Sequence, residues 1–192
     1  MSGMRALPLP EVDDLLPTLP AKYAAIAAIG VTTGCRISEI LALRRFDLLD
    51  RNGRLRDGIS FLKLKTRKNS HRRIGIPARF RPYVLRHLMD EERRGWERPD
   101  DWVFRGHNGG HLSRIAVYRF FRPLLGERHG THWMRKTFGQ EIFRYYLRQS
   151  GDGIRALELT RKALGHARLD TTVKYLGIEE QELEEAQEKI FG

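Results

Sequence analysis

The sequence predicts a mainly α-helical domain with a small antiparallel β-sheet, an α+β fold. Over most of the chain, apolar residues recur at helical spacing, as at Ile37 and Ile40. The stretch 48–77 differs, because it combines the tight-turn signal Asn52-Gly53 with a partly alternating apolar pattern. So short a β region indicates one small antiparallel sheet among helices rather than a doubly wound parallel sheet.

The first half of the chain begins with a loose, proline-containing lead-in and then becomes helical. Alanine and isoleucine dominate the next segment, which indicates a buried helix. A polar turn later separates two short apolar segments, as in a β-hairpin. The expected elements are a short helix near 11–16 within the lead-in 1–20, helices at 22–30 and 36–43, and strands at 59–65 and 72–77.

The second half is expected to consist of helices separated by capping residues and glycines. Ser113 and Asp170 carry side chains that cap helix N-termini, and Gly165 and Gly177 suit helix ends. The expected helices span 82–94, 113–121, 131–149 and 154–164, followed by a short one that carries Tyr175 and an acidic one at 179–192.

Size and composition fit one globular domain over residues 1–192. Apolar residues make up 41% of the chain and charged residues 31%, as in soluble globular proteins. The single cysteine, Cys35, excludes an internal disulfide and a cysteine zinc cluster. The chain has no run of about 18 apolar residues and no signal-peptide pattern at its N-terminus. We therefore expect a cytoplasmic protein without a membrane partner.

The chain is strongly basic, with a formal net charge of +11 and a pI near 10.2. Residues 179–192 nevertheless hold six glutamates and one lysine, so the remainder is more basic still. Arginine dominates the basic residues and suits bidentate contacts with phosphate. The charge indicates a polyanionic partner such as nucleic acid. Charge alone also allows a basic ribosome-associated protein or a merely soluble basic one.

Two motifs combine arginine with positions that favour anions. Arg36 lies at the N-terminus of an expected helix, and helix N-termini attract anions. Glu39 is three residues later, where it can pair with the side chain of Arg36. His132 and Arg135 are three residues apart, so both project from one helical face and can donate to one phosphate. Taken singly, each motif has a structural alternative: a surface arginine, or a half-buried histidine beside a solvated arginine.

A third motif ends in a tyrosine. His166 follows Gly165, whose missing side chain lets the backbone approach a neighbour closely. The phenol of Tyr175 can attack phosphorus when nearby cations stabilise its developing anion. A structural histidine and a packing tyrosine are the ordinary alternatives, so the weight of the interpretation lies in the order and spacing of all three motifs.

In that order, Thr33–Leu43, Thr131–Phe138 and Leu164–Tyr175 resemble the two arginine boxes and the nucleophile region of the tyrosine recombinases, the phage-integrase family. The resemblance extends from about Tyr23 to Gly177, which is most of the chain. It implies the family's mainly helical fold with a small antiparallel sheet. It also implies site-specific DNA recombination or integration by strand transesterification, with no metal and no cofactor.

The resemblance also assigns roles to single residues. Tyr175 would attack the scissile phosphate of double-stranded DNA and leave a 3′-phosphotyrosine and a free 5′-hydroxyl. A lysine of the hairpin would protonate the leaving oxygen: Lys65 is expected, and Lys68 is the alternative because the turn 66–71 is longer than the family's common pattern. The expected donors to the crowded phosphorane are Arg36, His132, Arg135 and His166.

Beyond the site, the family comparison raises questions about assembly. Only about 20 residues precede the start of the resemblance at Tyr23, so the N-terminal core-binding domain of most integrases is expected to be absent. The chain is then either the catalytic portion of a longer protein or a natural single-domain member. The resemblance implies a DNA-assembled homotetramer, in which residues 179–192 dock on a neighbour or pack on their own domain. Two alternative functions stay open: a catalytically weak or inactive DNA-binding relative, and a nicking enzyme like a type IB topoisomerase.

Overall fold

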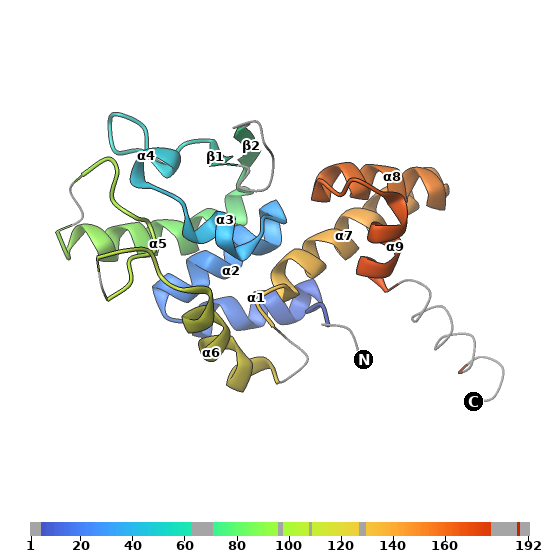
Figure 1. The fold of residues 1–192 in the computed structure, drawn as a ribbon, viewed down its shortest axis with the longest axis horizontal. Helices are drawn as coiled ribbons and strands as arrows, with labels where there is room; N and C mark the ends of the chain where they lie inside the picture. Colours follow the sequence, from blue (N-terminus) through green and yellow to red (C-terminus); the bar gives the residue numbers. More distant parts are fainter. Residues whose placement is uncertain are drawn as a thin grey trace.

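The structure of the chain, a computed structural model, describes residues 5–62, 71–95, 98–107, 109–126, 130–177 and 188. Helices dominate it, and the sheet in this part of the chain has two antiparallel strands (Figure 1), which confirms the predicted fold class. The helical elements are α1 (Leu9–Thr18), α2 (Ala21–Thr33), α3 (Ile37–Leu41), α4 (Arg45–Leu48), the 3-10 helix η1 (Ala78–Phe80), α5 (Arg81–Glu92), α6 (Arg114–Leu125), α7 (Trp133–Ser150), α8 (Gly153–Leu164) and α9 (Leu169–Leu176).

Helix α2 runs through the core because its sequence is apolar on every side. Residues 24–31 are all buried, and most of them are alanine or glycine, which lets neighbouring helices approach closely. Helices α5 and α7 both pack against it. At Gly30 the approach is closest, since an added Cβ would lie 2.8 Å from the Cβ of Met134 on α7. Any larger residue at this position would push α2 and α7 apart.

The hairpin consists of β1 (Gly58–Leu62) and β2 (His71–Gly75), paired so that Gly58 faces Gly75 and Leu62 faces His71. Ile59 and Phe61 of β1 are buried, and these alternate positions hold the strand on the core. The predicted first strand continued to residue 65. Its last three positions, and with them both Lys65 and Lys68, lie outside the described residues.

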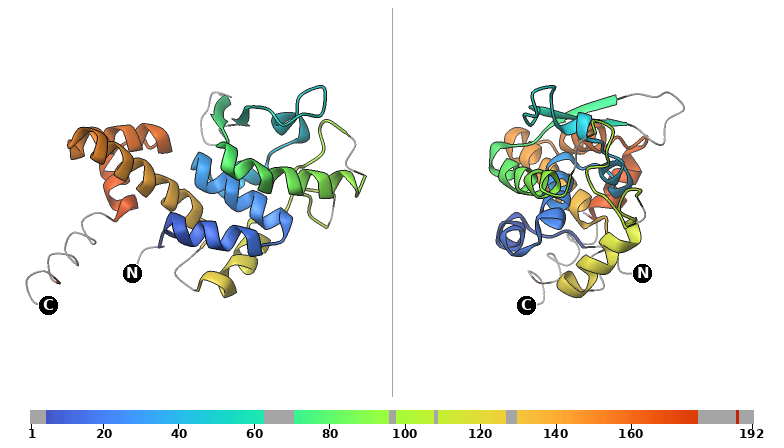
Figure 2. Two further views of the ribbon diagram at one scale, coloured as in Figure 1. Left: turned by 180° about the vertical axis from the view of Figure 1, so that it is seen from behind. Right: turned by 90° about the vertical axis from the view of Figure 1, so that its left-hand side faces the viewer.

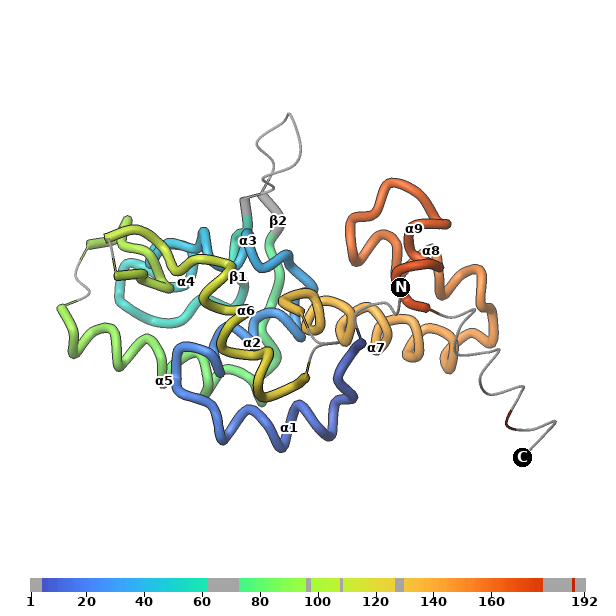
Figure 3. Tube along the Cα trace, turned by 60° about the horizontal axis from the view of Figure 1, so that its bottom comes forward, coloured from blue at the N-terminus to red at the C-terminus, as the bar shows by residue number. Residues whose placement is uncertain are grey.

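Helices α7, α8 and α9 extend from one end of the body formed by α1–α6 and the hairpin (Figures 1 and 2). Helix α8 packs along α7, and α9 contacts both. Each of the three ends at a glycine with positive φ: Gly151, Gly165 and Gly177. Figure 3 shows α8–α9 and the hairpin on the same side of α7 and α2, so this arm and the hairpin face a common side of the protein.

The segment before α1 is fastened to α7 by one side chain. The backbone N–H of Leu7 donates to Oγ1 of Thr137 at 2.9 Å, and that hydroxyl donates to the carbonyl of Leu7 at 2.8 Å. Thr137 is 1% exposed and lies two residues after Arg135. The lead-in is therefore tied to the helix that carries the second arginine motif.

Several boundaries differ from the predictions, for local reasons. Asp170 does not cap α9: Arg168 occupies the N-cap position, and Asp170 forms an ion pair with it at 2.8 Å. Helix α6 continues past Phe121 to Leu125 and contains Pro123 in its last turn. Helices α4 and η1 were not predicted, being too short for a periodic pattern. Of the acidic helix expected at 179–192, only residue 188 is described.

Across the described ranges, none of the helices combines the length and the hydrophobicity that a bilayer span demands.

Candidate active site

Arg36 lies at the junction between α2 and α3. It is the N-cap residue of α3, and its backbone N–H donates to Oε2 of Glu39 at 2.7 Å. The other carboxylate oxygen of Glu39 accepts from Nη1 of Arg36 at 3.4 Å. One carboxylate thus holds both the backbone and the guanidinium of Arg36, whose side chain stays 29% exposed. The predicted pairing of these two residues is confirmed.

Arg135 is almost fully buried, at 4% exposure. Its Nη1 donates to the carbonyl of Gly34, the C-cap of α2, and its Nη2 donates to the carbonyl of Leu164, the last residue of α8, at 2.6 Å. These partners are 101 and 29 residues away in the sequence. The guanidinium therefore joins three helices, in addition to any role toward a ligand. Burial lowers its pKa from the ordinary arginine value.

His166 and Tyr175 lie edge to face, with ring centroids 5.2 Å apart and an interplanar angle of 80°. Nδ1 of His166 is hydrogen-bonded to the hydroxyl of Thr172 at 3.1 Å. Burial lowers the pKa of His166 to about 4, and the nearby positive charges of Arg135 and Arg36 act in the same direction. The imidazole is therefore neutral at pH 7.

The hydroxyl of Tyr175 is buried and has no hydrogen-bond partner of good geometry among the described residues. Burial raises the pKa of this phenol to about 12, and Arg135 and Arg36 act against that rise. An unpaired buried hydroxyl is costly in a folded protein and calls for an explanation. Here it lies beside two guanidinium groups, which is the environment that would stabilise a phenolate leaving or attacking a phosphate.

Four of the six predicted site residues thus come together, from four separate elements: Arg36, Arg135, His166 and Tyr175. His132 is the N-cap residue of α7, three positions before Arg135 and with helical backbone angles. The backbone of His132 therefore continues the helical path of α7, and His132 lies on the same helix face as Arg135, as the i, i+3 spacing predicts. Lys65 lies outside the described residues, so its place relative to the others stays a prediction.

Sequence reasoning missed the groups that hold the site together. Thr172 is fully buried and bonded to His166, although the sequence only shows it one turn before Tyr175. The carbonyls of Gly34 and Leu164 carry no signal of their own, because any residue has a carbonyl. The only sequence signal for these two helix ends is the glycine found at each of them, Gly34 and Gly165.

A buried tyrosine beside two arginines, on a mainly helical domain with one hairpin, agrees with the family that the motifs resemble. The chain belongs to the phage integrase family, whose sequence profile matches residues 9–182. It is 28% identical over 168 residues to the probable integrase/recombinase YoeC of Bacillus subtilis, covering 85% of this chain and 81% of that protein. It is 27% identical over 175 residues to the tyrosine recombinase XerH of Helicobacter pylori, covering 86% of this chain and 44% of XerH.

Solved structures agree with this assignment. The XerH recombinase bound to palindromic difH substrate, in a post-cleavage complex, superposes with a TM-score of 0.64 at 26% identity, over 96% of this chain and 53% of that one. The XerA recombinase superposes with a TM-score of 0.69 over 100% of this chain and 67% of that one, at 20% identity, and supports the fold alone. The chain thus spans about half the length of XerH.

Proposed function

We propose that the chain cleaves and rejoins DNA strands in site-specific recombination or integration, with Tyr175 as the nucleophile. One observation carries the proposal: a buried, unpaired phenol lies beside the two arginines of the family's boxes. The relatives support it, since XerH is described as a tyrosine recombinase and was solved bound to a DNA substrate after cleavage.

In the proposed reaction, the phenol oxygen of Tyr175 attacks the scissile phosphorus, and the bond from phosphorus to the 5′-oxygen breaks. The products are a 3′-phosphotyrosine and a 5′-hydroxyl, and the reverse reaction with another 5′-hydroxyl rejoins the strands. Arg36 and Arg135 donate to the non-bridging oxygens as negative charge builds up. His132, one turn before Arg135, supplies a further donor.

Two protons must move in this reaction. The phenol, with its pKa raised to about 12, is protonated at neutral pH and transfers its proton to solvent water as it attacks. The leaving 5′-oxygen needs a proton, which we assign to a lysine of the hairpin, Lys65 or Lys68. We assign the Thr172 hydroxyl as the donor to Nδ1, so that the neutral His166 carries its proton on Nε2 and donates to a phosphate oxygen.

The two lysines are separated by a substrate with a sulfur at the scissile 5′ position. Sulfur leaves without a proton, so loss of the general acid is rescued on this substrate and loss of any other group is not. We expect Lys65→Ala to be slow on the normal substrate and rescued by sulfur, and Lys68→Ala to be mild on both. The opposite pattern assigns the acid to Lys68.

We further propose double-stranded DNA as the partner and a DNA-assembled homotetramer as the active form, with residues 1–192 acting as one catalytic unit. The acidic segment 179–192 is unsuited to DNA and fits a protein contact, with a neighbouring protomer or with its own domain. Truncation after Ile178 separates the two: loss of synapsis with intact single-site cleavage supports the neighbour, and a lowered melting temperature supports the own domain. A DNA-acting enzyme of this kind would work in the cytoplasm, at the nucleoid.

Covalent capture tests the function whatever the target sequence is. A pool of nicked duplexes, randomised around the nick, is incubated with the protein, and DNA that stays bound in detergent is sequenced. We expect a covalent adduct through Tyr175 at an enriched sequence, and none with Tyr175→Phe, which should still bind DNA. Adducts without sequence preference, together with relaxation of supercoiled plasmid, would point to a topoisomerase-like enzyme. DNA binding without any adduct would point to an inactive relative.

A further inference from the structure

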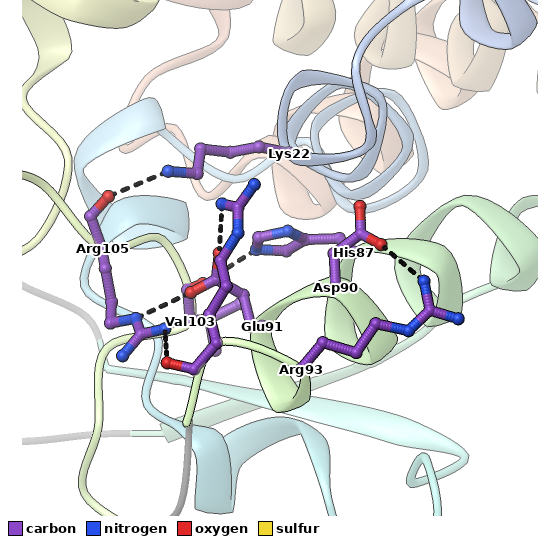
Figure 4. A network of polar contacts seen from close by, with 8 residues as sticks. Lys22, His87, Asp90, Glu91, Arg93, Val103 and Arg105 are labelled. Carbon is purple, nitrogen blue, oxygen red and sulfur yellow. Dashed lines mark hydrogen bonds and ion pairs between the residues drawn. The ribbon is translucent and has the colours of Figure 1, made fainter.

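A charged pocket lies at the other end of α2 from the tyrosine site. Figure 4 shows the polar contacts of Lys22, Glu91 and Arg105, which line it. Its volume is about 380 Å³, and it is bordered by the first turn of α2, the end of α5, residues 105–107 and Leu112. Three cationic side chains line it: Lys22, Arg94 and Arg105. At 1.5 Å per residue, Lys22 is roughly 18 Å along the helix from Gly34. The pocket is therefore separate from the site around Tyr175.

Glu91 organises the cations of this pocket. It is 1% exposed, and its Oε2 accepts from Nε of Arg105 at 2.7 Å while its Oε1 accepts from Nη1 of Arg94 at 3.3 Å. It is the only carboxylate among the described lining residues, and both of its oxygens are engaged. The lining side chains therefore keep a positive net charge. The guanidinium of Arg105 is held tightly by its 2.7 Å contact with Glu91, whereas Arg94 is paired more loosely, at 3.3 Å.

Lys22 adds a third positive charge next to this pair. Its Nζ donates to the backbone carbonyl of Arg105 at 3.1 Å. Burial lowers the pKa of Lys22 from its usual value; Glu91 acts against that change, whereas Arg94 and Arg105 add to it. Arg105 engages its Nε and Nη2 with protein atoms, and a guanidinium has five N–H donors, so donors remain for a ligand. The cations repel one another, and a bound anion would relieve that repulsion.

The wall of the pocket is built before any ligand arrives. Nε2 of His87 on α5 is hydrogen-bonded to the carbonyl of Val103 at 2.8 Å, and its ring stacks on Phe104 with centroids 5.1 Å apart. Burial lowers the pKa of His87, so the ring is neutral and Nε2–H is the donor. This contact fixes the backbone that leads into Arg105. A preformed arrangement of donors loses less entropy when it binds an anion.

We propose that this pocket binds a phosphate group. Guanidinium groups match phosphate geometry with bidentate hydrogen bonds, and the lysine adds a point charge. The volume falls in the range of ligand sites and exceeds what one phosphate needs, while Tyr23 and Leu112 give an apolar wall for an attached sugar. The phosphate belongs either to the backbone of bound DNA or to a free nucleotide or pyrophosphate. The DNA alternative rests on the proposed function.

Two neighbouring arginines of α5 provide a matched test. The side chain of Arg94 lines the pocket, is 65% exposed and pairs with Glu91 three residues earlier. The side chain of Arg93 points elsewhere, is 76% exposed and pairs with Asp90, also three residues earlier (Figure 4). Arg94→Gln and Arg93→Gln therefore remove the same charge at nearly the same place. Arg105 continues to hold Glu91 in both, and a melting curve checks that both fold.

The first arm titrates pyrophosphate into the full chain by calorimetry at low salt. If the phosphate is free, the wild type and Arg93→Gln bind alike, and Arg94→Gln binds about tenfold more weakly, as expected for one charge-assisted contact. Lys22→Gln, which keeps most of the length of the stem, weakens binding to a similar degree. A folding defect in Lys22→Gln leaves the comparison of Arg94 with Arg93 as the deciding one.

The second arm measures binding of a random-sequence duplex as a function of salt. If the phosphate belongs to DNA, the slope of log affinity against log salt falls by about 0.9 in Arg94→Gln and stays unchanged in Arg93→Gln. If Arg94→Gln and Arg93→Gln show the same pyrophosphate affinity and the same salt dependence of duplex binding, the proposal that this pocket binds phosphate is wrong. Strong duplex binding by the wild type in that case leaves the proposed function intact, so the two failures are distinguishable.

Discussion

Gly34 is the position where a single methyl group should disturb both the fold and the site. It is the C-cap of α2 with φ of 62°, and its carbonyl accepts from the guanidinium of Arg135. A Cβ added there would lie 2.3 Å from Cδ1 of Phe138, in the face of that ring. Because the ring belongs to α7 and Arg36 follows two residues later, Gly34→Ala strains the connection between both arginines.

The cost can be worked out from two contributions. A left-handed backbone costs a residue with a side chain about 1–2 kcal/mol, and overpacking against Phe138 adds about 1–3 kcal/mol. Gly34→Ala should therefore lower the free energy of unfolding by about 2–5 kcal/mol. Gly53 is the matched control, since its φ is 73° and nothing lies within 4 Å of an added Cβ. Gly53→Ala should cost only the backbone part, about 1–2 kcal/mol.

Urea unfolding at neutral pH measures both variants, and single-turnover cleavage measures the site. Gly34→Ala should slow cleavage by about 10², the loss expected when a clamp moves by about 1 Å, whereas Gly53→Ala should leave cleavage unchanged. Adding Phe138→Ala removes the ring, so the double variant should recover about 1 kcal/mol or more relative to additivity. Equal losses of stability for Gly34→Ala and Gly53→Ala would refute the reasoning, because crowding would then contribute nothing.

Four further variants separate stability from chemistry. Tyr175→Phe should abolish adducts yet leave the protein at least as stable, with the free energy of unfolding raised by about 0–3 kcal/mol, because the mutation removes a buried hydroxyl without a well-formed hydrogen bond among the described residues. A large loss of stability in a urea melt would mean that the hydroxyl has a partner in solution. Arg135→Ala should lower the free energy of unfolding by about 3 kcal/mol or more through its two carbonyl contacts. Arg36→Ala, which breaks one half-buried ion pair but leaves Glu39 its backbone N–H donor, should lower it by only about 1–2 kcal/mol. Both should slow cleavage about 10²-fold. Equal melting curves for the two variants would contradict the inference that Arg135 stabilises the fold by joining three helices. Since the pKa of His166 is about 4 in the folded protein and 6.5 unfolded, the unfolded chain takes up the proton first, so stability should fall as pH drops from about 6.5 to about 4. His166→Gln should flatten the urea midpoints over that window, and an unchanged slope would assign it to other groups.

The sequence was informative where local chemistry decides the structure. The apolar run of α2, the glycines that end α8 and α9, and the cap of α6 by Ser113, whose Oγ accepts from the N–H of Ala116, follow from neighbouring residues alone. It was misleading at Asp170, where an ion pair with Arg168 replaces the expected cap. Both residues are polar and adjacent to the helix start, so the sequence alone does not show which of them occupies the N-cap position.

Within the site, the identities of four gathered residues could be predicted from motif order, but their mutual support could not. The partners of Arg135 are backbone carbonyls far along the chain, and only the folded structure brings them together. The hydroxyl of Thr172 on His166 is a similar case, because a threonine before a helical tyrosine has many possible partners. Motifs specify which groups meet a ligand, while the neighbours that orient them depend on tertiary packing.

The two carbonyls that hold Arg135 are the C-terminal ends of α2 and α8, and each such end carries about half a negative charge from the helix dipole. Together they come close to balancing one guanidinium. The protein can therefore keep this cation buried without a carboxylate hydrogen-bonded to it among the described residues. In the proposed reaction, a carboxylate in that place would repel the scissile phosphate, whereas the two helix ends neutralise the arginine without adding a full negative charge.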